Sequence, residues 1–361
     1  MKKLPMVVVA MSGGVDSSVA AALLVERGYQ VIGMMLRLWS EPGKQAENRC
    51  CTPDSMALAR QVSARLGIPF YAVDVQEYFR EVVVQSFIDG YLQGTTPNPC
   101  IVCNREIRRG FLLDRALAFG AEFLATGHYA RVERAADGAV HLLRGKDAAK
   151  DQSYVLSVLN QVQLGRTLFP LGGYTKTEVR ELARKYNLPV ASRADSQDLC
   201  FLGRDDYRSF LARTAPQSGQ PGPVVDPDGR VIGAHHGLAY YTIGQRKGLG
   251  VSAPEPLYVI AKDLENNALV VGPLSSLGQH ELFAGDVNWI SGSPPAEPLR
   301  VQAKIRYKAN EAWAVLHPLA DGRVRVIFDQ PLRDITPGQR VVFYQGEECL
   351  GGGTILLQSG G

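Results

Sequence analysis

Directly behind an apolar run that ends at Ala10, the chain places two glycines, an aspartate and three serines in the stretch SGGVDSS, residues 12–18. Glycines let backbone N–H groups approach a phosphate without a side chain in the way, and a helix N-terminus adds partial positive charge. Serine hydroxyls can donate to phosphate oxygens, and Asp16 can cap the helix or help to hold Mg²⁺ beside the phosphates. The stretch therefore predicts a nucleotide-binding loop.

A Walker A loop is excluded because no Lys-Ser or Lys-Thr pair follows the glycines. The alternative to nucleotide binding is a simple glycine turn in which an aspartate or serine caps the helix. The combination Ser-Gly-Gly-x-Asp-Ser directly after an apolar strand favours nucleotide binding.

Two cysteines have neighbours that favour thiolate chemistry. Cys103 follows a Pro-Asn-Pro turn, near the expected start of a helix, and precedes an arginine-rich segment. A helix N-terminus and nearby cations both favour the thiolate, which is the nucleophilic form. Cys200 lies 97 residues later, behind the polar loop Asp-Ser-Gln-Asp. The two thiols can meet in space; the alternative is that both are small core residues, which the polar flanks disfavour.

Composition sets the wider frame. The chain has 361 residues, of which 45% are hydrophobic and 21% charged, with a formal net charge of +3. This length allows two or three globular domains, and the charge neither demands nor excludes a polyanionic partner. We find no signal-peptide pattern and no apolar run of the roughly 20 residues that span a bilayer, so we expect a cytoplasmic protein. Six irregularly spaced cysteines then indicate reactive or metal-binding thiols before disulfides.

The elements that must position these residues alternate along the first 200 positions. Apolar runs at 7–11, 29–36, 68–75 and 122–128 are expected to form parallel strands, and residues 16–27 and 55–66 have helical spacing. A further helix is expected to start at Thr175, because Glu178 completes a capping box. The alternation predicts an α/β fold with a doubly wound parallel sheet, which binds ligands at the carboxyl ends of its strands.

Beyond about residue 203 turn-forming residues increase, and beyond about 280 the chain alternates like short antiparallel strands, with a hairpin turn at Asp321-Gly322. This pattern predicts a small antiparallel barrel or sandwich. We therefore divide the chain into a catalytic domain (1–203), a central or linker domain (204–279) and a C-terminal β-barrel domain (280–361).

The phosphate loop resembles the PP-loop of the ATP pyrophosphatases, which cleave ATP between the α and β phosphates and adenylate a substrate oxygen. Six further blocks resemble, in order and over nearly the whole length, the bacterial tRNA-specific 2-thiouridylases. These blocks are TPNPCIVCNREI (96–107), ATGHYAR (125–131), LLRGKDAAKDQSYVL (142–156), DSQDLCF (195–201), GLAYYTIGQRKGLG (237–250) and VVFYQGEECLGGG (341–353).

This resemblance implies ATP-dependent thiolation of the wobble uridine of tRNA. Adenylation of the uracil C2 oxygen would turn a very poor leaving group into AMP. Cys200 would then carry a persulfide sulfur, received from a donor protein, that attacks C2. Cys103 would act as the nucleophile, either freeing sulfide or closing a disulfide with Cys200. The implied ATP pocket comprises Ala10, Met11, Ser12, Gly13, Gly14, Val15, Asp16, Ser17, Leu36 and Gly127.

At one position the chain departs from the family pattern, because Cys100 stands where an aspartate is proposed as general base. Cys100, Cys103 and Cys200 could instead hold an iron–sulfur cluster with one iron open to bind sulfide. Zinc is disfavoured because a structural site normally takes four ligands. The persulfide relay is the first hypothesis and the cluster its rival. Cys50, Cys51 and Cys349 are interpreted as structural or incidental.

RNA binding needs cations for the phosphates and planar or hydrogen-bonding groups for the bases. Clusters with these features occur near residue 150, at 245–248 and at 304–308, although each alone would be a solvated face. The resemblance places tRNA contacts in the catalytic domain and the barrel, at Lys150, Asp151, Gln152, His128, Arg306, Tyr307 and Gln339. Without the resemblance, His128 would be read as a histidine with satisfied bonds at a strand end.

Two rival classes remain open. Another ATP pyrophosphatase, such as an amidotransferase-type synthetase or argininosuccinate synthetase, would deliver nitrogen and would need no cysteine pair. A nucleotide-gated RNA-binding protein or iron–sulfur sensor would bind ATP without turnover. Release of AMP and pyrophosphate only in the presence of tRNA distinguishes thiolation from both.

Overall fold

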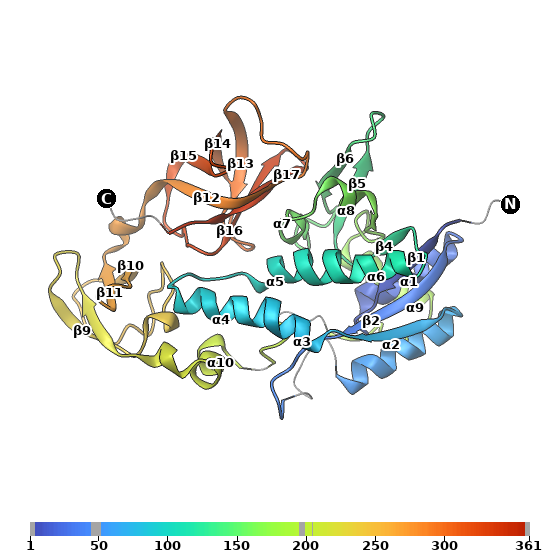
Figure 1. Ribbon diagram of the computed structural model, residues 1–361, viewed down its shortest axis with the longest axis horizontal. Coiled ribbons are helices and arrows are strands. Elements are labelled where there is room, and N and C mark those ends of the chain that lie inside the picture. The colour runs from blue at the N-terminus through green and yellow to red at the C-terminus, as the bar shows by residue number, and fades with distance from the viewer. Residues whose placement is uncertain (1–3, 45–51, 195–198, 204, 358–361) are drawn as a thin grey trace.

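The computed structural model describes residues 4–44, 52–194, 199–203 and 205–357. Figure 1 shows a parallel sheet with its helices on the right, a β-barrel at the upper left and a smaller sheet at the lower left. The predicted α/β fold with a C-terminal barrel is therefore confirmed. Of the two forms expected for the C-terminal domain, a barrel or a sandwich, the structure has the barrel. Among the described residues, no helix is both long and apolar enough to cross a bilayer.

The parallel sheet has the strand order β3-β2-β1-β4-β7. Its strands are β1 (Met6–Ala10), β2 (Gln30–Arg37), β3 (Phe70–Asp74), β4 (Phe123–Ala125) and β7 (Thr167–Leu168). β3 and β4 fall within the apolar runs identified in the sequence, and β1 and β2 are offset from their runs by one residue. From β1 the chain adds β2 and β3 on one side and later β4 and β7 on the other side. The loops that follow β1 and β4 therefore lead away from each other at the carboxyl edge of the sheet. Doubly wound sheets bind their ligands at this point.

Helices cover both faces of this sheet, as the alternation of side chains along a strand requires. Val7 and Val9 of β1 pack with α1 (Val15–Glu26), α2 (Pro53–Leu66) and α9 (Lys176–Lys185). Val8 packs on the opposite face with α6 (Leu112–Ala118). The predicted capping box of α9 is confirmed, because Thr175 accepts a hydrogen bond from the backbone N–H of Glu178 at 3.3 Å.

Two nearly continuous helical segments cross the middle of the molecule (Figure 1). One comprises α3 (Gln76–Phe79), the π-helical η1 (Arg80–Val84) and α4 (Gln85–Leu92). The other comprises α5 (Pro99–Val102), the π-helical η2 (Cys103–Phe111) and α6. Stretches of π-helix are rare and frequently mark functional sites. Here one of them begins at Cys103.

After β4 the chain forms a hairpin of β5 (Ala130–Arg134) and β6 (Val140–Arg144), followed by α7 (Ser153–Leu156) and α8 (Gln161–Gly165). The central part then contains α10 (Tyr207–Thr214), η3 (Pro216–Gly219) and η4 (Leu238–Tyr240) beside a four-stranded sheet of order β10-β11-β8-β9. Its strands are β8 (Gly222–Val225), β9 (Val231–His235), β10 (Tyr258–Asp263) and β11 (Ala268–Gly272), and η5 (Leu274–Leu277) leads out of it.

The barrel has the order β12-β15-β14-β13-β16-β17 and closes through pairing of β12 with β17. Its strands are β12 (Gln279–Trp289), β13 (Leu299–Lys304), β14 (Ala312–Pro318), β15 (Val324–Leu332), β16 (Arg340–Gln345) and β17 (Glu348–Ile355). The predicted hairpin turn joins β14 to β15, and Gly322 there adopts a φ of 83° that favours glycine.

The barrel and the parallel-sheet domain share hydrogen-bonded strands. β17 pairs with β6 of the early hairpin, with Cys349 opposite Leu142 and Glu348 opposite Leu143. The ring of His141 also contacts the Glu348 carboxylate at 2.6 Å. Strands that are about 200 residues apart in sequence therefore belong to one sheet.

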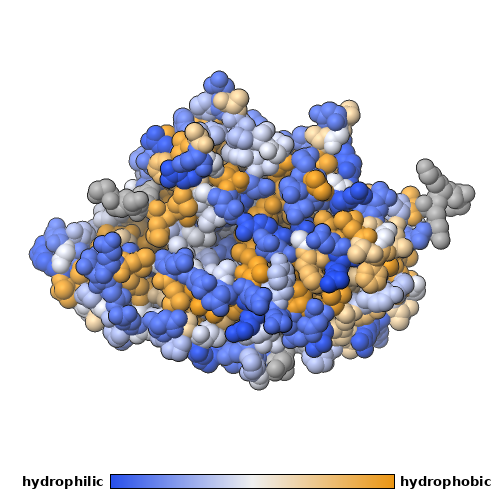
Figure 2. All heavy atoms as spheres, in the orientation of Figure 1, coloured by the Kyte–Doolittle hydropathy of each residue, from blue (hydrophilic) through white to orange (hydrophobic). Residues whose placement is uncertain are grey.

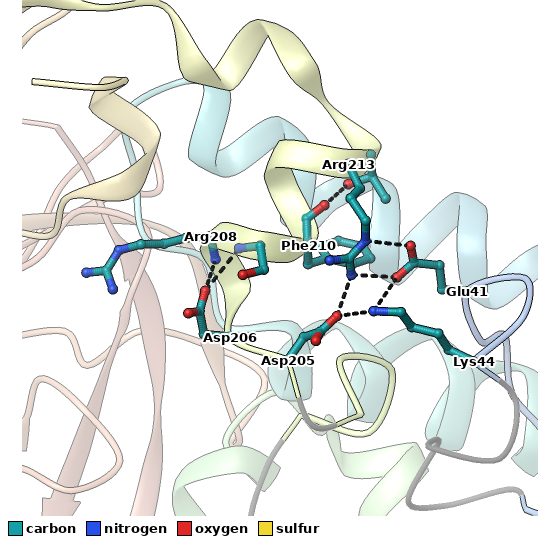
Figure 3. Close-up of polar contacts among 9 residues, drawn as sticks. Glu41, Lys44, Asp205, Asp206, Arg208, Phe210 and Arg213 are labelled. Atoms are coloured by element: carbon teal, nitrogen blue, oxygen red, sulfur yellow. Dashed lines mark hydrogen bonds and ion pairs between the residues drawn. The ribbon is translucent and has the colours of Figure 1, made fainter.

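A charged cluster joins the segment after β2 to α10 (Figure 3). Arg213 donates to both carboxylate oxygens of Glu41, at 2.8 and 2.9 Å, and also to Asp205, which Lys44 contacts as well. These pairs connect the parallel-sheet domain to the central part of the chain.

Figure 2 shows hydrophilic and hydrophobic side chains interspersed over the face of the molecule that Figure 1 presents to the viewer.

Candidate active site

The stretch SGGVDSS turns the chain from β1 into α1 at the carboxyl edge of the sheet. Gly13 has a φ of 71°, and a Cβ there would stand 2.3 Å from the carbonyl oxygen of Ser55, so only glycine fits. Gly14 is the N-cap residue of α1. The expectation that Asp16 caps this helix is therefore wrong, because the backbone of Gly14 occupies that position.

The serines of the loop bond to its own backbone and to each other. The Ser17 hydroxyl accepts from the Ser12 N–H at 3.1 Å, and the Ser18 hydroxyl donates to the Gly14 carbonyl at 2.8 Å. These contacts hold the loop in shape before any ligand is considered. The N-terminus of α1 faces the carboxyl edge of the sheet, which suits an anion.

Gly127 closes the other side of the loop. It follows β4, and a Cβ on it would stand 2.7 Å from the Ser17 backbone nitrogen and 2.8 Å from the Asp16 carbonyl carbon. The structure thus brings together residues 10–17 and Gly127, as the sequence predicted for an ATP pocket. Leu36, also predicted there, lies at the end of β2 beside β1 and packs with the sheet cluster that includes Ala10.

The Asp16 carboxylate is surrounded by two donors that the sequence did not reveal. Lys176 Nζ lies 2.8 and 2.9 Å from its two oxygens, and the Tyr129 hydroxyl donates to it at 2.7 Å. Lys176 is the first residue of α9, so its position follows from the capping box at Thr175. The predicted helix start was a signal that could have led to this lysine.

Arg193 is a third residue that the sequence did not reveal. Its guanidinium donates to the Gly13 carbonyl at 2.7 Å and to the Ser55 hydroxyl at 2.7 Å. Gly13 and Ser55 are also the two residues of the close backbone approach described above, so Arg193 stabilises the loop at this point.

Cys103 and Cys200 lie in one side-chain cluster, as the pairing of thiols requires. Cys103 is 9% exposed and belongs to a hydrophobic cluster that includes Phe79, Phe87 and Phe201. Cys200 is half-buried and packs against this cluster. Leu36 packs against this cluster as well as against the sheet cluster. Leu36 therefore connects the cluster that contains both thiols to the strands that carry the phosphate loop.

Cys100 lies at the start of α5 and is exposed, while Cys103 opens η2 one turn later. Asn98 caps this helix by accepting from the Cys100 N–H at 3.2 Å, which confirms that Cys103 is close to a helix N-terminus. Within the described part of the chain, no group of three His, Cys, Asp or Glu side chains is placed to hold a metal ion. The iron–sulfur cluster stays a prediction.

Several of the candidate RNA contacts gather beside this helix start. Tyr307 is 38% exposed, its hydroxyl approaches the Asp151 carbonyl at 3.4 Å, and Cys100 is near enough to help raise the pKa of Tyr307, after burial and Asp151. Gln339 donates to the Thr96 carbonyl at 2.8 Å, just before the cysteine segment. Residues predicted from both ends of the chain thus meet near Cys100.

The other candidates are tied into the protein itself. Asp151 accepts from the Gly145 N–H at 2.9 Å and from the Ser153 hydroxyl at 2.7 Å, and its side chain is 8% exposed. Gln152 accepts from the Tyr129 N–H at 3.0 Å. Both side chains therefore shape the segment, in which Lys150 is half-buried.

Arg306 is half-buried and donates to the Ile243 carbonyl at 3.3 Å and to Thr336. It joins the barrel to the turn that contains the basic residues 245–248. His128 is almost fully buried at the end of β4, where its Nδ1 lies 2.8 Å from the Thr126 hydroxyl.

The remaining cysteines fall elsewhere. Cys349 is fully buried in β17, and burial raises the pKa of its thiol to about 12, which suits the structural role expected of it. Cys50, Cys51 and residues 195–198 lie outside the described residues.

Comparisons with known proteins cover almost the whole chain. A family model described as "tRNA methyl transferase HUP domain" matches residues 5–204, "tRNA methyl transferase PRC-barrel domain" matches 208–273, and "Aminomethyltransferase beta-barrel domain" matches 279–355. The tRNA-specific 2-thiouridylase of Heliobacterium modesticaldum is 52% identical over 354 residues, 97% of this chain and 92% of that protein. Its counterpart in Moorella thermoacetica is 51% identical over 96% of this chain and 98% of that protein.

Among solved structures, a complex of a 4-thiouridine synthetase with RNA and bound ATP is 21% identical, with a TM-score of 0.33. The matched region covers 59% of this chain and 50% of that one.

Proposed function

The chain belongs to the tRNA-specific 2-thiouridylase family, and from that premise we propose that it replaces the C2 oxygen of the wobble uridine of tRNA by sulfur, with consumption of ATP. The observation that carries this proposal is the shared cluster of Cys103 and Cys200, which Leu36 connects to the sheet behind the phosphate loop. A rival enzyme that delivers nitrogen would have no use for two thiols in one side-chain cluster.

In the first step, the uracil O2 attacks the α-phosphate of ATP and pyrophosphate leaves. The glycine loop and the N-terminus of α1 supply backbone donors to the phosphates, with no side chain in the way. We assign Lys176 to neutralising phosphate charge, because its ammonium group already lies at the loop on Asp16. The 35% exposed carboxylate of Asp16, with phosphate oxygens, would hold Mg²⁺, which offsets further negative charge when bound.

In the second step, the terminal sulfur of a persulfide on Cys200 attacks C2. A carbon–sulfur bond forms, the bond from C2 to the adenylated oxygen breaks, and AMP leaves with the electron pair. The Cys103 thiolate then attacks the Cys200 sulfur, so that the bond between Cys200 and the transferred sulfur breaks. The electron pair stays on the sulfur bonded to C2, which gives 2-thiouridine and a Cys103–Cys200 disulfide.

The next turnover needs two electrons from a dithiol reductant and a new sulfur from a donor protein. Both reactants fit a cytoplasmic enzyme, where thiols are kept reduced. In this scheme the first 203 residues carry the chemistry, and the barrel from about residue 280 helps to hold the tRNA. Tyr307 and Gln339 support this division, because both come from the barrel segment and lie beside the cysteine helix.

The test is a thiolation assay with ATP, tRNA and a persulfide donor. Cys103→Ser and Cys200→Ser should each abolish thiouridine formation while leaving ATP binding intact. Cys349→Ala removes a fully buried thiol that lies outside the cluster of Cys103 and Cys200 and should retain thiolation, which controls for the loss of a cysteine as such. Thiolation by either serine variant, or release of AMP and pyrophosphate without tRNA, would contradict the proposal.

The alternative form of the second step uses an iron–sulfur cluster on Cys100, Cys103 and Cys200 to deliver sulfide. An anaerobic preparation assayed for iron and for visible absorbance decides between the two. Stoichiometric iron that is lost on Cys100→Ser would favour the cluster. Full activity without iron would favour the persulfide relay.

A further inference from the structure

Four charged side chains form one cluster between the parallel-sheet domain and the central part of the chain (Figure 3). Arg213 donates to both carboxylate oxygens of Glu41 and also to Asp205, and Lys44 contacts Asp205 from another side. Lys44 Nζ lies 3.9 Å from Glu41 Oε2 as well. Two acids and two bases therefore pair with one another, at side-chain exposures between 17% and 38%. We call these four residues the charge cluster.

Asp205 of the charge cluster ends the segment that carries Cys200. The Asp205 N–H donates to the Leu202 carbonyl at 3.1 Å, and the Leu202 N–H donates to the Leu199 carbonyl at 3.2 Å. Cys200 lies within the first of these two turns. Leu202 is also buried, in the side-chain cluster that contains both thiols. A displacement of Asp205 would therefore be passed to Cys200 through two hydrogen-bonded turns.

The other half of the charge cluster belongs to the segment that leaves the parallel sheet at the end of β2. The Lys44 N–H donates to the Glu41 carbonyl at 2.9 Å, so one turn presents both side chains. Just before this turn, Trp39 packs against the cluster of the two thiols, and its ring meets that of Phe210 of α10 edge to face, with centroids 6.4 Å apart. The charge cluster therefore ties the Cys200 segment to a stretch of chain that leads directly out of β2.

The charges of the cluster determine geometry more than stability. Ion pairs at this exposure contribute little to the free energy of unfolding, because water screens them. The planar guanidinium of Arg213, in contrast, bonds to both oxygens of Glu41, and such a two-point contact fixes orientation. Lys44 and Arg213 lower the pKa of Asp205, and Arg213 lowers that of Glu41, so both carboxylates are ionised at neutral pH.

We propose that the charge cluster positions Cys200 for the transfer of sulfur, with Arg213 and Asp205 as positioning residues. This inference rests on the proposed function, because it takes Cys200 as the carrier of the sulfur and Cys103 as the thiol that attacks it. That attack requires the two sulfur atoms to be aligned, and a misplacement of about 1 Å costs on the order of a hundredfold in rate between such groups. Adenylation does not depend on the charge cluster, because the glycine loop is held in shape by its own hydrogen bonds.

The placement of the two thiols can be measured without tRNA or ATP. The full chain is equilibrated with reduced and oxidised glutathione, and the disulfide between Cys103 and Cys200 is quantified by mass spectrometry of alkylated peptides. Oxidised glutathione takes up the two electrons of the thiols, so the equilibrium constant reports how readily the two sulfurs meet. We expect Arg213→Met to lower this constant roughly tenfold, which makes the reduction potential about 30 mV less negative. Arg213→Lys keeps the charge and can bond to one carboxylate, so it should recover part of the loss.

Arg300→Met is the matched control, because Arg300 also donates to both oxygens of a carboxylate, that of Asp329, but on the barrel. Its equilibrium constant should equal that of the wild type. Asp205→Asn removes the charge from the Cys200 segment at constant size and should behave as Arg213→Met does, which keeps the test open if the methionine variant does not fold. A wild-type constant in the Arg213 and Asp205 variants overturns the proposal, and so does an equal fall in Arg300→Met.

A single turnover separates positioning from a merely structural role. When a persulfide is loaded on the enzyme before ATP and tRNA are added, Arg213→Met should release pyrophosphate at the wild-type rate and form 2-thiouridine roughly tenfold more slowly. An equal loss in both rates would indicate a structural role and contradict the proposal. If the wild type itself forms no 2-thiouridine, the proposed function fails, whereas the glutathione equilibrium still measures how the charge cluster places the two thiols.

Discussion

Replacing Gly127 by alanine is the sharpest test of how the nucleotide loop is built. The added methyl group would stand 2.7 Å from the Ser17 nitrogen and 2.8 Å from the Asp16 carbonyl carbon, whereas ordinary contact begins at 3.4 Å. Both neighbours are backbone atoms, so no side chain can rotate away. The loop or β4 must retreat by 3.4 − 2.7 = 0.7 Å.

That displacement sets the expected size of the effect. A misplacement of about 1 Å costs on the order of a hundredfold in rate when groups must be aligned for reaction. We therefore expect Gly127→Ala to lower kcat/KM for pyrophosphate release by roughly that factor. Overpacking should also cost on the order of 1–3 kcal/mol of stability, which leaves a folded protein to measure.

The assay follows tRNA-dependent release of pyrophosphate, with ATP affinity from calorimetry and folding from thermal melting. Gly173→Ala is the matched control, because Gly173 is exposed, no atom lies within 4 Å of its added Cβ, and its φ is not positive. Affinity for tRNA without ATP should be unchanged in both variants. If Gly127→Ala turns over ATP as Gly173→Ala does, the close approach of β4 to the loop is not part of nucleotide binding.

Four further outcomes are expected. Asp16→Ala should weaken adenylation without weakening binding of tRNA alone, and a selective loss of tRNA affinity in a filter-binding assay would show that the loop is misassigned. Tyr307→Ala should weaken tRNA binding by about 1–3 kcal/mol if the ring stacks on a base, whereas Tyr307→Phe should not, and equal losses in both variants would point to the hydroxyl instead. The hydrogen bond that His141 donates to the Glu348 carboxylate raises the pKa of His141 above its ordinary value of about 6.5, so this pair stabilises the fold fully below that value and loses its effect as the pH rises through the folded pKa. His141→Gln should therefore flatten the pH dependence of urea midpoints between pH 6 and 8.5; a slope identical to that of the wild type would exclude the pair as its source. Arg213→Met should lower the urea midpoint by an amount equivalent to about 0.5 kcal/mol at low salt and by less in 1 M NaCl, since screening weakens the pairs, and a salt-independent loss would instead indicate lost packing.

Much of the fold could be predicted because the relevant signals are local. The apolar runs of β1 to β4 are long enough to show, and the capping box of α9 lies within four residues. β7 has only two residues and shows no period. In the central sheet, β8 contains Pro223 and β9 contains Gly233, which interrupt the strand pattern. The π-helical backbone of η2 has no side-chain pattern by which it could be predicted.

In the site, too, the local features could be predicted and the distant contacts could not. The glycines of the phosphate loop were recognisable because they are consecutive, but the partners of that loop are distant. Lys176 reaches Asp16 across 160 positions, and Arg193 reaches Gly13 across 180. Asp151 was predicted to contact RNA, yet its carboxylate is occupied by Gly145 and Ser153. A position in a motif does not reveal which of its groups are already bonded.

The strand pairing between β6 and β17 limits how this chain can be dissected. A fragment that ends before the barrel would leave β6 with unpaired N–H and C=O groups along one side. Such an exposed strand edge favours pairing with other molecules and therefore aggregation. Expression of the nucleotide-binding half alone should therefore give aggregates in place of a minimal enzyme. For the same reason the barrel is not a hinged accessory, because β17 is fixed to β6 by backbone pairing. Under the proposed function, a tRNA bound to the barrel would therefore keep a fixed position relative to Cys103 and Cys200.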